Sequence, residues 1–201
     1  MLKVGLTGGI GCGKSFVGEA LADYGCLVVH ADDLGHEVLA RGGAGYALVV
    51  AEFGREILDD KGEIDRKALG ALVFGYPERL DRLNAIVHPA VIRREEELLA
   101  EFAARHPDGI AVVEAAILVE TGSYKRFDKL VLVTCREEQQ VERAMRREGA
   151  SEGDVRARIG RQMPLAEKRK FADFVIDTSG EKADTLRQTR AVYDTLRRIE
   201  S

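Results

Sequence analysis

The sequence lacks three features that would assign it to a secreted, disulfide-built or membrane class. Three cysteines, Cys12, Cys26 and Cys135, are an odd and widely spaced set without a CxxC pair, which indicates neither a disulfide framework nor a zinc site. No apolar run approaches the ~18 residues of a membrane span, and no signal peptide is recognisable. We therefore expect a soluble, cytoplasmic protein with reduced thiols and no membrane partner.

An excess of positive charge is also missing. The 30 Lys and Arg residues are outnumbered by 34 Asp and Glu residues, giving a net charge of −4. Proteins that coat nucleic acid are usually basic, so we expect no nucleic-acid partner, although a local basic site for a small anion stays open. The length of 201 residues predicts one domain with insertions, at the usual ~150 residues per domain. Because 45% of the residues are hydrophobic, the chain can fill a core.

Short apolar runs alternate with longer amphipathic stretches, which is typical of a parallel α/β sheet. The near-continuous apolar character of these runs suits strands that are buried on both faces. Apolar spacing also predicts a last helix from about residue 182 to residue 199. The five predicted strands are Lys3–Thr7, Cys26–His30, Ile110–Glu114, Lys129–Thr134 and Phe174–Asp177.

The connection between the second and third predicted strands far exceeds the ~30 residues of a simple βαβ unit. Apolar residues keep a helical period between Leu80 and Phe102, so this segment is predicted to be a helical insertion, residues 35–106. Pro89 suits the first turn of a helix that begins near His88. The glycine-rich stretch 42–45 is predicted to be a hinge or turn.

A second long connection, residues 136–171, is rich in arginine. Ten residues between 136 and 170 are Lys or Arg and seven are Asp or Glu. This pattern fits an arginine-rich helical lid over a phosphate site, and it fits a solvated helix pair of mixed charge equally well. The remaining segments, residues 1–34, 107–135 and 172–201, form the predicted core of a single domain.

The strongest motif is GGIGCGKS at residues 8–15, which matches the phosphate-binding loop G-x-x-x-x-G-K-[ST] between a strand and a helix. Glycines let the backbone curl so that its N–H groups point at phosphate oxygens, and the helix N-terminus adds partial positive charge. Lys14 is expected to reach the outer phosphates and the Ser15 hydroxyl to ligate Mg²⁺. The predicted nucleotide-binding residues are Gly8, Gly9, Gly11, Cys12, Gly13, Lys14, Ser15 and Phe16.

A phosphate loop does not by itself define the reaction. A GTPase normally reads guanine with Asn-Lys-x-Asp, but the only asparagine, Asn84, is followed by Ala85. No D-x-x-G sequence follows the third predicted strand, where a switch segment would lie. These absences favour a kinase over a guanine-nucleotide switch.

Acidic residues follow two of the predicted strands. Asp32 and Asp33 come directly after the second strand, and Glu114 ends the third. In a parallel sheet the carboxyl ends of the strands meet at the ligand crevice, so these side chains are candidates for contacting Mg²⁺ or an acceptor hydroxyl. A helix N-cap for one aspartate and a purely structural role for Glu114 are the alternatives.

Several motifs together resemble the dephospho-CoA kinase family, over residues 3 to about 180. The segment Asn84–Pro89 resembles its N-x-x-x-H-P stretch, and Glu114–Glu120 resembles its D-x-P-L-L-x-E stretch. The other matching segments are LTGGIGCGKS at 6–15, His30-Ala31-Asp32, the lid residues Gln140, Arg143 and Arg147, and the closing residues Arg158, Ile159, Gln162, Lys168, Ala172, Asp173 and Asp177.

The chain departs from the family's usual pattern at a few positions. His30 replaces the first aspartate of D-A-D, so any role of that carboxylate is lost. Phe16 stands where threonine is common, Ala116 replaces a proline, and Thr178 stands where asparagine is frequent near the adenine. Glu114 is longer than the usual aspartate. None of these changes removes Lys14, Ser15 or Asp32.

The resemblance implies a P-loop nucleotide kinase-like α/β fold of three α/β/α layers, with a five-stranded parallel sheet, a substrate-binding helical insertion and a lid. It implies transfer of phosphate from ATP, with Mg²⁺, to the ribose 3′-hydroxyl of dephospho-CoA, the last step of coenzyme A biosynthesis. Asp32, Lys14 and Arg143 are then the catalytic residues, and Asp32, His88 and Glu114 bind the substrate.

Three points stay open at the level of the sequence. Capping of its own helix is the alternative for His88, and a salt bridge with Glu120 or a neighbour is the alternative for Arg147. A kinase for another small acceptor, such as a nucleoside monophosphate, and a non-catalytic ATP-binding regulator are the rival functions. A monomer is favoured.

Overall fold

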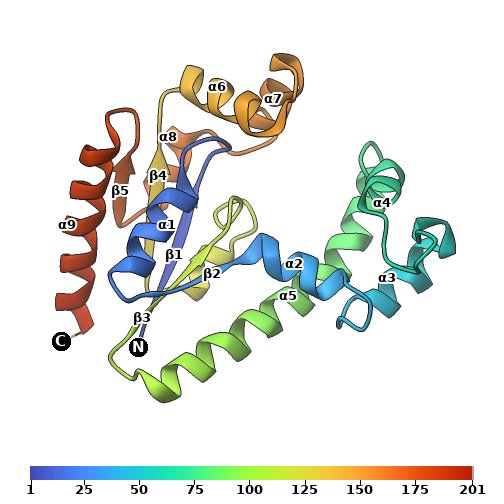
Figure 1. The fold of residues 1–201 in the computed structure, drawn as a ribbon, viewed down its shortest axis with the longest axis horizontal. Helices are drawn as coiled ribbons and strands as arrows, with labels where there is room; N and C mark the ends of the chain where they lie inside the picture. The colour runs from blue at the N-terminus through green and yellow to red at the C-terminus, as the bar shows by residue number, and fades with distance from the viewer. Residues whose placement is uncertain (201) are drawn as a thin grey trace. The chain divides into compact units, whose positions relative to one another are not determined.

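A computed structural model describes residues 1–200, except for the side chains of Glu148 and Glu200 (Figure 1). It divides into two compact units, one made of residues 1–30 and 101–201 and the other of residues 31–100. The first unit contains a five-stranded sheet, and the second is helical. Along residues 1–200, no helix combines the length and the apolar character needed to cross a membrane.

All five strands of the sheet unit run parallel, in the order β2-β3-β1-β4-β5. The predicted strands and the α/β fold class are confirmed, with shifts of one residue at some ends. The strands are β1 (Leu2–Gly8), β2 (Leu27–His30), β3 (Ile110–Glu114), β4 (Lys129–Thr134) and β5 (Phe174–Asp177).

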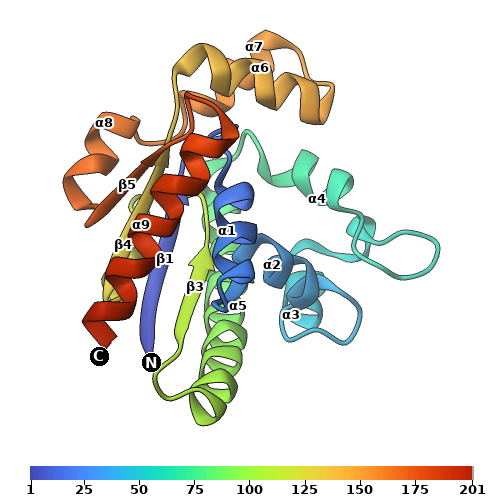
Figure 2. The same ribbon diagram turned by 60° about the vertical axis from the view of Figure 1, so that its left-hand side comes forward.

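Helices α1 (Lys14–Asp23) and α9 (Lys182–Glu200) pack side by side on one face of this sheet, as Figure 2 shows. Alternation along β1 sends Val4 and Leu6 into the core beneath these helices. Gly5, between them, faces the opposite side, where Leu118 and Leu130 belong to a second apolar cluster. Burial on both faces explains why the strands read as continuous apolar runs.

The segment between β4 and β5 is helical, as the charge-rich sequence predicts. Val141 and Ala144 of one helix and Val155 of the next share a small apolar core, with Ile10 of the loop after β1 packed against it. The Ser151 hydroxyl caps the second helix by accepting a bond from the amide of Asp154 at 3.2 Å. The elements are α6 (Glu137–Glu148), α7 (Glu152–Ile159), α8 (Leu165–Lys168) and η3 (Arg169–Phe171); η2 (Ser123–Arg126) precedes β4.

The helical unit has its own core of Val49, Ile57, Leu69 and Val73. The predicted turn at residues 42–45 is present between its first two helices. Its elements are α2 (Ala31–Leu39), α3 (Tyr46–Phe53), η1 (Arg55–Ile57), α4 (Arg66–Val73) and the first part of α5 (Pro77–Arg105).

The prediction of a helix beginning near His88 is wrong. Helix α5 begins at Pro77, where the missing proline N–H costs nothing, and Pro89 lies inside it. Apolar residues before Pro89, among them Leu83 and Val87, pack on the core of the helical unit, and Leu99 after it is buried. Packing on both sides of Pro89 therefore overrides the local cost of an interior proline.

Candidate active site

The loop at residues 8–15 connects β1 to α1, as the motif requires. Gly11 and Gly13 have φ values of 72° and 78°, in the left-handed region that favours glycine. A Cβ on Gly11 would also lie 2.4 Å from the main-chain oxygen of Gln140. The loop therefore needs glycine at this position for two independent reasons, conformation and close backbone approach.

Lys14 is the first residue of α1, and its ammonium group folds back over the loop. Its Nζ atom donates to the carbonyl oxygens of Gly8 at 3.3 Å and Gly9 at 3.2 Å. A long, flexible side chain can exchange such carbonyl partners for phosphate oxygens of stronger negative charge. The structure thus places the predicted cation directly at the phosphate loop.

Ser15, Glu114 and His30 form a connected row at the carboxyl ends of β3 and β2. The Ser15 Oγ atom donates to Glu114 Oε1 at 3.0 Å, and Glu114 Oε2 lies 2.9 Å from His30 Nδ1. His30 and Glu114 are register partners on neighbouring strands. Gly18 of α1 leaves room for this carboxylate, since a Cβ there would lie 3.2 Å from Oε2.

The neighbouring oxygen atoms of Ser15 and Glu114 could together serve as ligands for a metal ion. Mg²⁺ is commonly held by one or two carboxylates together with substrate phosphates, and Ser15 and Glu114 supply donors of the required kind. Within residues 1–200, no group of three or more His, Cys, Asp or Glu side chains could hold a metal by itself. An ion held by Ser15 and Glu114 would complete its ligands with phosphate oxygens or water.

Two glutamines from the α6–α8 segment hold the phosphate loop, and sequence reasoning assigned neither a role. The buried Gln140 side chain donates from Nε2 to the Ile10 carbonyl at 2.9 Å and contacts Cys12 Sγ at 3.2 Å. Gln162 Oε1 accepts a bond from the Ile10 amide at 3.0 Å. Their membership of family-like motifs was the only signal, because spacing alone does not reveal which side chain reaches the loop.

Arg143 of α6 is joined to the loop through Thr178. Its guanidinium donates to the Thr178 hydroxyl at 2.9 Å and to the Thr178 carbonyl at 2.8 Å. The Thr178 hydroxyl in turn donates to the Cys12 carbonyl at 2.9 Å. Phe16, another predicted nucleotide contact, lies under the ammonium group of Lys182, 5.5 Å from its ring centre.

A buried ion pair joins the end of the α6–α8 segment to the chain after β3. The Lys168 side chain is fully buried, and its Nζ atom lies 2.8 Å from Glu120 Oε1 and 2.7 Å from the Ala116 carbonyl. The Met163 amide donates to the same Glu120 oxygen at 3.1 Å. Glu120 therefore pairs with Lys168, whereas a pair with Arg147 was only one of the alternatives that the sequence left open.

Asp32 and His88 belong to the helical unit. Asp32 and Asp33 are exposed in the first turn of α2, which begins at Ala31. Neither aspartate therefore occupies the N-cap position, which was the alternative for one of them. Both carboxylates interact favourably with the N-terminal end of the helix dipole. His88 is exposed inside α5, so the alternative that it caps its own helix is wrong.

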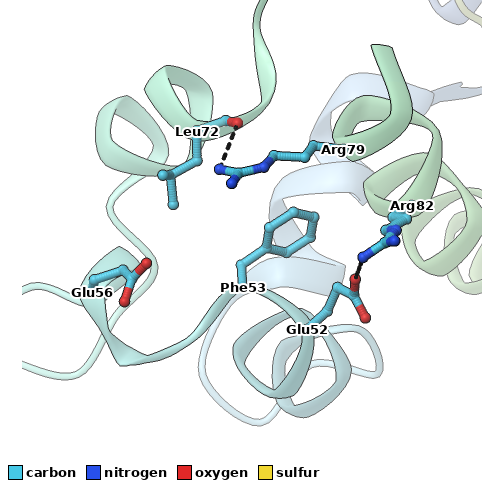
Figure 3. Close-up of a pocket in the computed structure, with 6 residues that line it drawn as sticks. All are labelled: Glu52, Phe53, Glu56, Leu72, Arg79 and Arg82. Carbon is cyan, nitrogen blue, oxygen red and sulfur yellow. Dashed lines mark hydrogen bonds and ion pairs between the residues drawn. The ribbon is translucent and has the colours of Figure 1, made fainter. Parts of the chain in front are cut away.

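The helical unit also has a cavity of about 210 Å³ (Figure 3). Both acidic and basic side chains line this cavity. Arg82 forms an ion pair with Glu52 at 3.0 Å, and Arg79 donates to the Leu72 carbonyl at 3.5 Å. Sequence reasoning did not find this cavity. Its lining residues are Glu52, Phe53, Glu56, Leu72, Arg79 and Arg82.

Comparison with known proteins gives one consistent result. A family model described as dephospho-CoA kinase matches residues 2–184. A dephospho-CoA kinase from Aquifex aeolicus is 42% identical over 198 residues, which are 98% of this chain and 99% of that protein.

Two solved structures are similar to nearly the whole chain. The crystal structure of TT1252 from Thermus thermophilus has a TM-score of 0.83 and 36% identity, over 97% of each chain. A dephospho-CoA kinase from Campylobacter jejuni has a TM-score of 0.62 and 25% identity, over 96% of each chain.

Proposed function

This chain belongs to the dephospho-CoA kinase family, and from that membership we propose the roles of its residues in the reaction. It is a kinase that uses ATP. The reaction transfers the γ-phosphoryl group to the ribose 3′-hydroxyl of dephospho-CoA and yields ADP and coenzyme A. In our proposal the loop at residues 8–15 holds the triphosphate, and Asp32 orients the acceptor hydroxyl.

One observation carries this assignment of roles. Lys14 Nζ lies within 3.3 Å of the carbonyl oxygens of the glycine loop, and Ser15 of the same loop bonds to Glu114 at 3.0 Å. A cation, a hydroxyl and a carboxylate thus meet beside a backbone turn at the N-terminus of a helix. That combination suits a triphosphate better than it suits a neutral ligand.

The residues act mainly by positioning and by electrostatic stabilisation, because phosphoryl transfer passes through a loose transition state. Asp32 accepts a hydrogen bond from the 3′-hydroxyl and holds its oxygen toward the γ-phosphorus. Lys14 balances the negative charge on the transferred group. Arg143 adds a second positive charge when its guanidinium exchanges Thr178 for phosphate oxygens.

Mg²⁺ is the metal that the donor set at Ser15 and Glu114 suits. When bound there with a nucleotide, it neutralises phosphate charge. His30 Nδ1 lies 2.9 Å from the second oxygen of Glu114, and this neighbour limits the directions in which the carboxylate can point. In the acceptor site, we assign His88 and Glu114 to substrate binding, with the helical insertion of residues 35–106 as the substrate-binding part and residues 136–171 as the lid.

Lid closure over the loop would exclude water, which otherwise competes with the acceptor for the phosphoryl group. The contacts of Gln140 and Gln162 with Ile10 support this role, because they join the predicted lid to the phosphate loop itself.

The experiment that tests the function is ADP release from ATP over a panel of acceptors. Strong stimulation by dephospho-CoA is the expected result. The product should be heavier than dephospho-CoA by one phosphoryl group, about 80 Da. Greater stimulation by a nucleoside monophosphate would transfer the assignment to another small-acceptor kinase. The absence of stimulation by any acceptor, with ATP still bound, would instead indicate an ATP-binding regulator.

We also propose that the protein works as a monomer in the cytoplasm. Its three cysteines are free thiols, the state that reducing compartments maintain. Light scattering of the purified chain at micromolar concentration tests the oligomeric state, and a stable dimer would contradict it.

A further inference from the structure

Two cysteines that are far apart in the sequence meet at the phosphate loop. Cys12 lies within the loop, and Cys135 directly follows β4. Their Sγ atoms are 3.5 Å apart, with both thiols free. Cys12 is fully buried, whereas Cys135 is only half-buried. No other role described above uses this pair of sulfur atoms.

The surroundings favour a negative charge on Cys12. The Cys135 thiol donates to Cys12 Sγ, Gln140 Nε2 contacts it at 3.2 Å, and the Lys14 ammonium lies near. The hydrogen bond from Cys135, with the help of Lys14, lowers the pKa of Cys12 to about 7. The same hydrogen bond, together with burial, raises the pKa of Cys135. Above a pH of about 7, the pair therefore holds a single proton between its two sulfur atoms.

A small oxidant has a route to this pair. A cavity of about 490 Å³ in the sheet unit is lined by Cys135, Gly9 and Gln140 and by residues of the predicted lid. This volume easily admits a hydroperoxide. Cys135 is thus the sulfur that meets the oxidant, and Cys12 is the buried sulfur behind it.

We propose that Cys12 and Cys135 form a reversible disulfide, driven by a hydroperoxide, that disables the phosphate loop. The proposal rests on the proposed function in one respect, namely that this loop binds ATP.

The reaction proceeds in two balanced steps. The Cys135 sulfur attacks one peroxide oxygen while its proton passes to the Cys12 thiolate; the O–O bond breaks, and hydroxide leaves. Cys135 is now a sulfenic acid. The Cys12 thiol then attacks the Cys135 sulfur, the S–O bond breaks, and water leaves with the Cys12 proton. Two thiols are oxidised to one disulfide, and the peroxide is reduced.

Bond formation has to move the loop. A disulfide needs sulfur atoms about 2.05 Å apart, so the pair must approach by roughly 1.5 Å. Cys12 stands between Gly11 and Gly13, whose left-handed conformations shape the loop, and its carbonyl accepts a bond from Thr178 at 2.9 Å. A displaced Cys12 therefore carries the neighbouring amide groups away from the positions that hold phosphate oxygens.

The experiment uses the full chain before and after treatment with hydrogen peroxide, and then after dithiothreitol. Non-reducing peptide mass spectrometry identifies the linked cysteines, and calorimetry measures the ATP affinity. We expect a Cys12–Cys135 link, at least a tenfold loss of ATP affinity, and recovery of both thiols and affinity on reduction. The reduced protein tests the proposed function separately, because it must bind ATP before any oxidation.

Two variants complete the design, each compared with its own untreated sample. In Cys135→Ser the Cys12–Cys135 link cannot form, so reduction after peroxide treatment should not restore the lost ATP affinity. Cys26→Ala, which alters a buried cysteine outside the pair, should respond to peroxide as the wild type does. A link that leaves ATP affinity unchanged, a link through Cys26, or intact Cys12 and Cys135 thiols after other residues have been oxidised would each overturn the proposal.

Discussion

The buried ion pair between Lys168 and Glu120 gives the sharpest prediction for stability. Lys168→Met removes a fully buried ammonium group that lies 2.8 Å from Glu120 Oε1 and 2.7 Å from the Ala116 carbonyl. The Glu120 carboxylate then stays largely buried without its cation. Breaking such a pair from one side costs about 3–5 kcal/mol. Because 19% of the Glu120 side chain is exposed, we expect the lower end, about 3 kcal/mol.

Thermal and urea unfolding measure this loss. At about 2–4 °C per kcal/mol for a chain of this size, Lys168→Met should lower Tm by roughly 6–12 °C. The double variant Lys168→Met with Glu120→Leu should recover much of the loss, since it leaves no unpaired buried charge.

The matched control is Lys170→Met. Lys170 is two residues away and forms an exposed pair with Glu167, at 66% and 51% side-chain exposure, which is worth at most about 1 kcal/mol. A Lys168→Met protein as stable as the Lys170→Met protein would refute the argument from burial.

Three further predictions concern the loop, the carboxylate beside it and a buried thiol. Gly11→Ala should lower ATP affinity at least tenfold, because it forces a strained φ and a contact with Gln140; calorimetry showing wild-type affinity would contradict this. Glu114→Gln should weaken Mn²⁺ binding to the ATP complex, measured by electron paramagnetic resonance, at least tenfold while Ser15 keeps its place in a crystal structure; equal Mn²⁺ affinity would exclude Glu114 from the metal site. Burial raises the pKa of Cys26 from 9.0 to about 12, so the Cys26 thiol deprotonates at a lower pH in the unfolded chain than in the folded protein. The free energy of unfolding should therefore fall as the pH rises from 9 toward 12, by about 1.4 kcal/mol per pH unit from this group. Urea unfolding of the wild type and of Cys26→Ala over this range should show the steeper fall only in the wild type, and parallel curves would contradict it.

Much of the sheet unit could be predicted from the sequence, because its signals are local. The five strands are short apolar runs buried on both faces, and the phosphate loop is a contiguous motif. Glu114 could be expected at the ligand edge of the sheet because the carboxyl ends of parallel strands meet there, whereas its bond to Ser15 came only from the structure.

Features that depend on tertiary packing could not be predicted in this way. Pro89 looked like the first turn of a helix, but packing on both sides carries α5 through it. Lys168 lies in a charge-rich stretch that suggests solvent exposure, yet it is fully buried. Only the fold brings Cys135 against Cys12 and His30 against Glu114.

The most direct test of the proposed chemistry is steady-state ADP formation by Asp32→Asn with saturating ATP and dephospho-CoA, together with its ATP affinity by calorimetry. Because asparagine keeps the shape and loses the charge that orients the hydroxyl, we expect kcat to fall at least tenfold, about 1.4 kcal/mol of transition-state stabilisation, while ATP binds as in the wild type. A variant that turns over at nearly the wild-type rate would contradict the role assigned to this carboxylate.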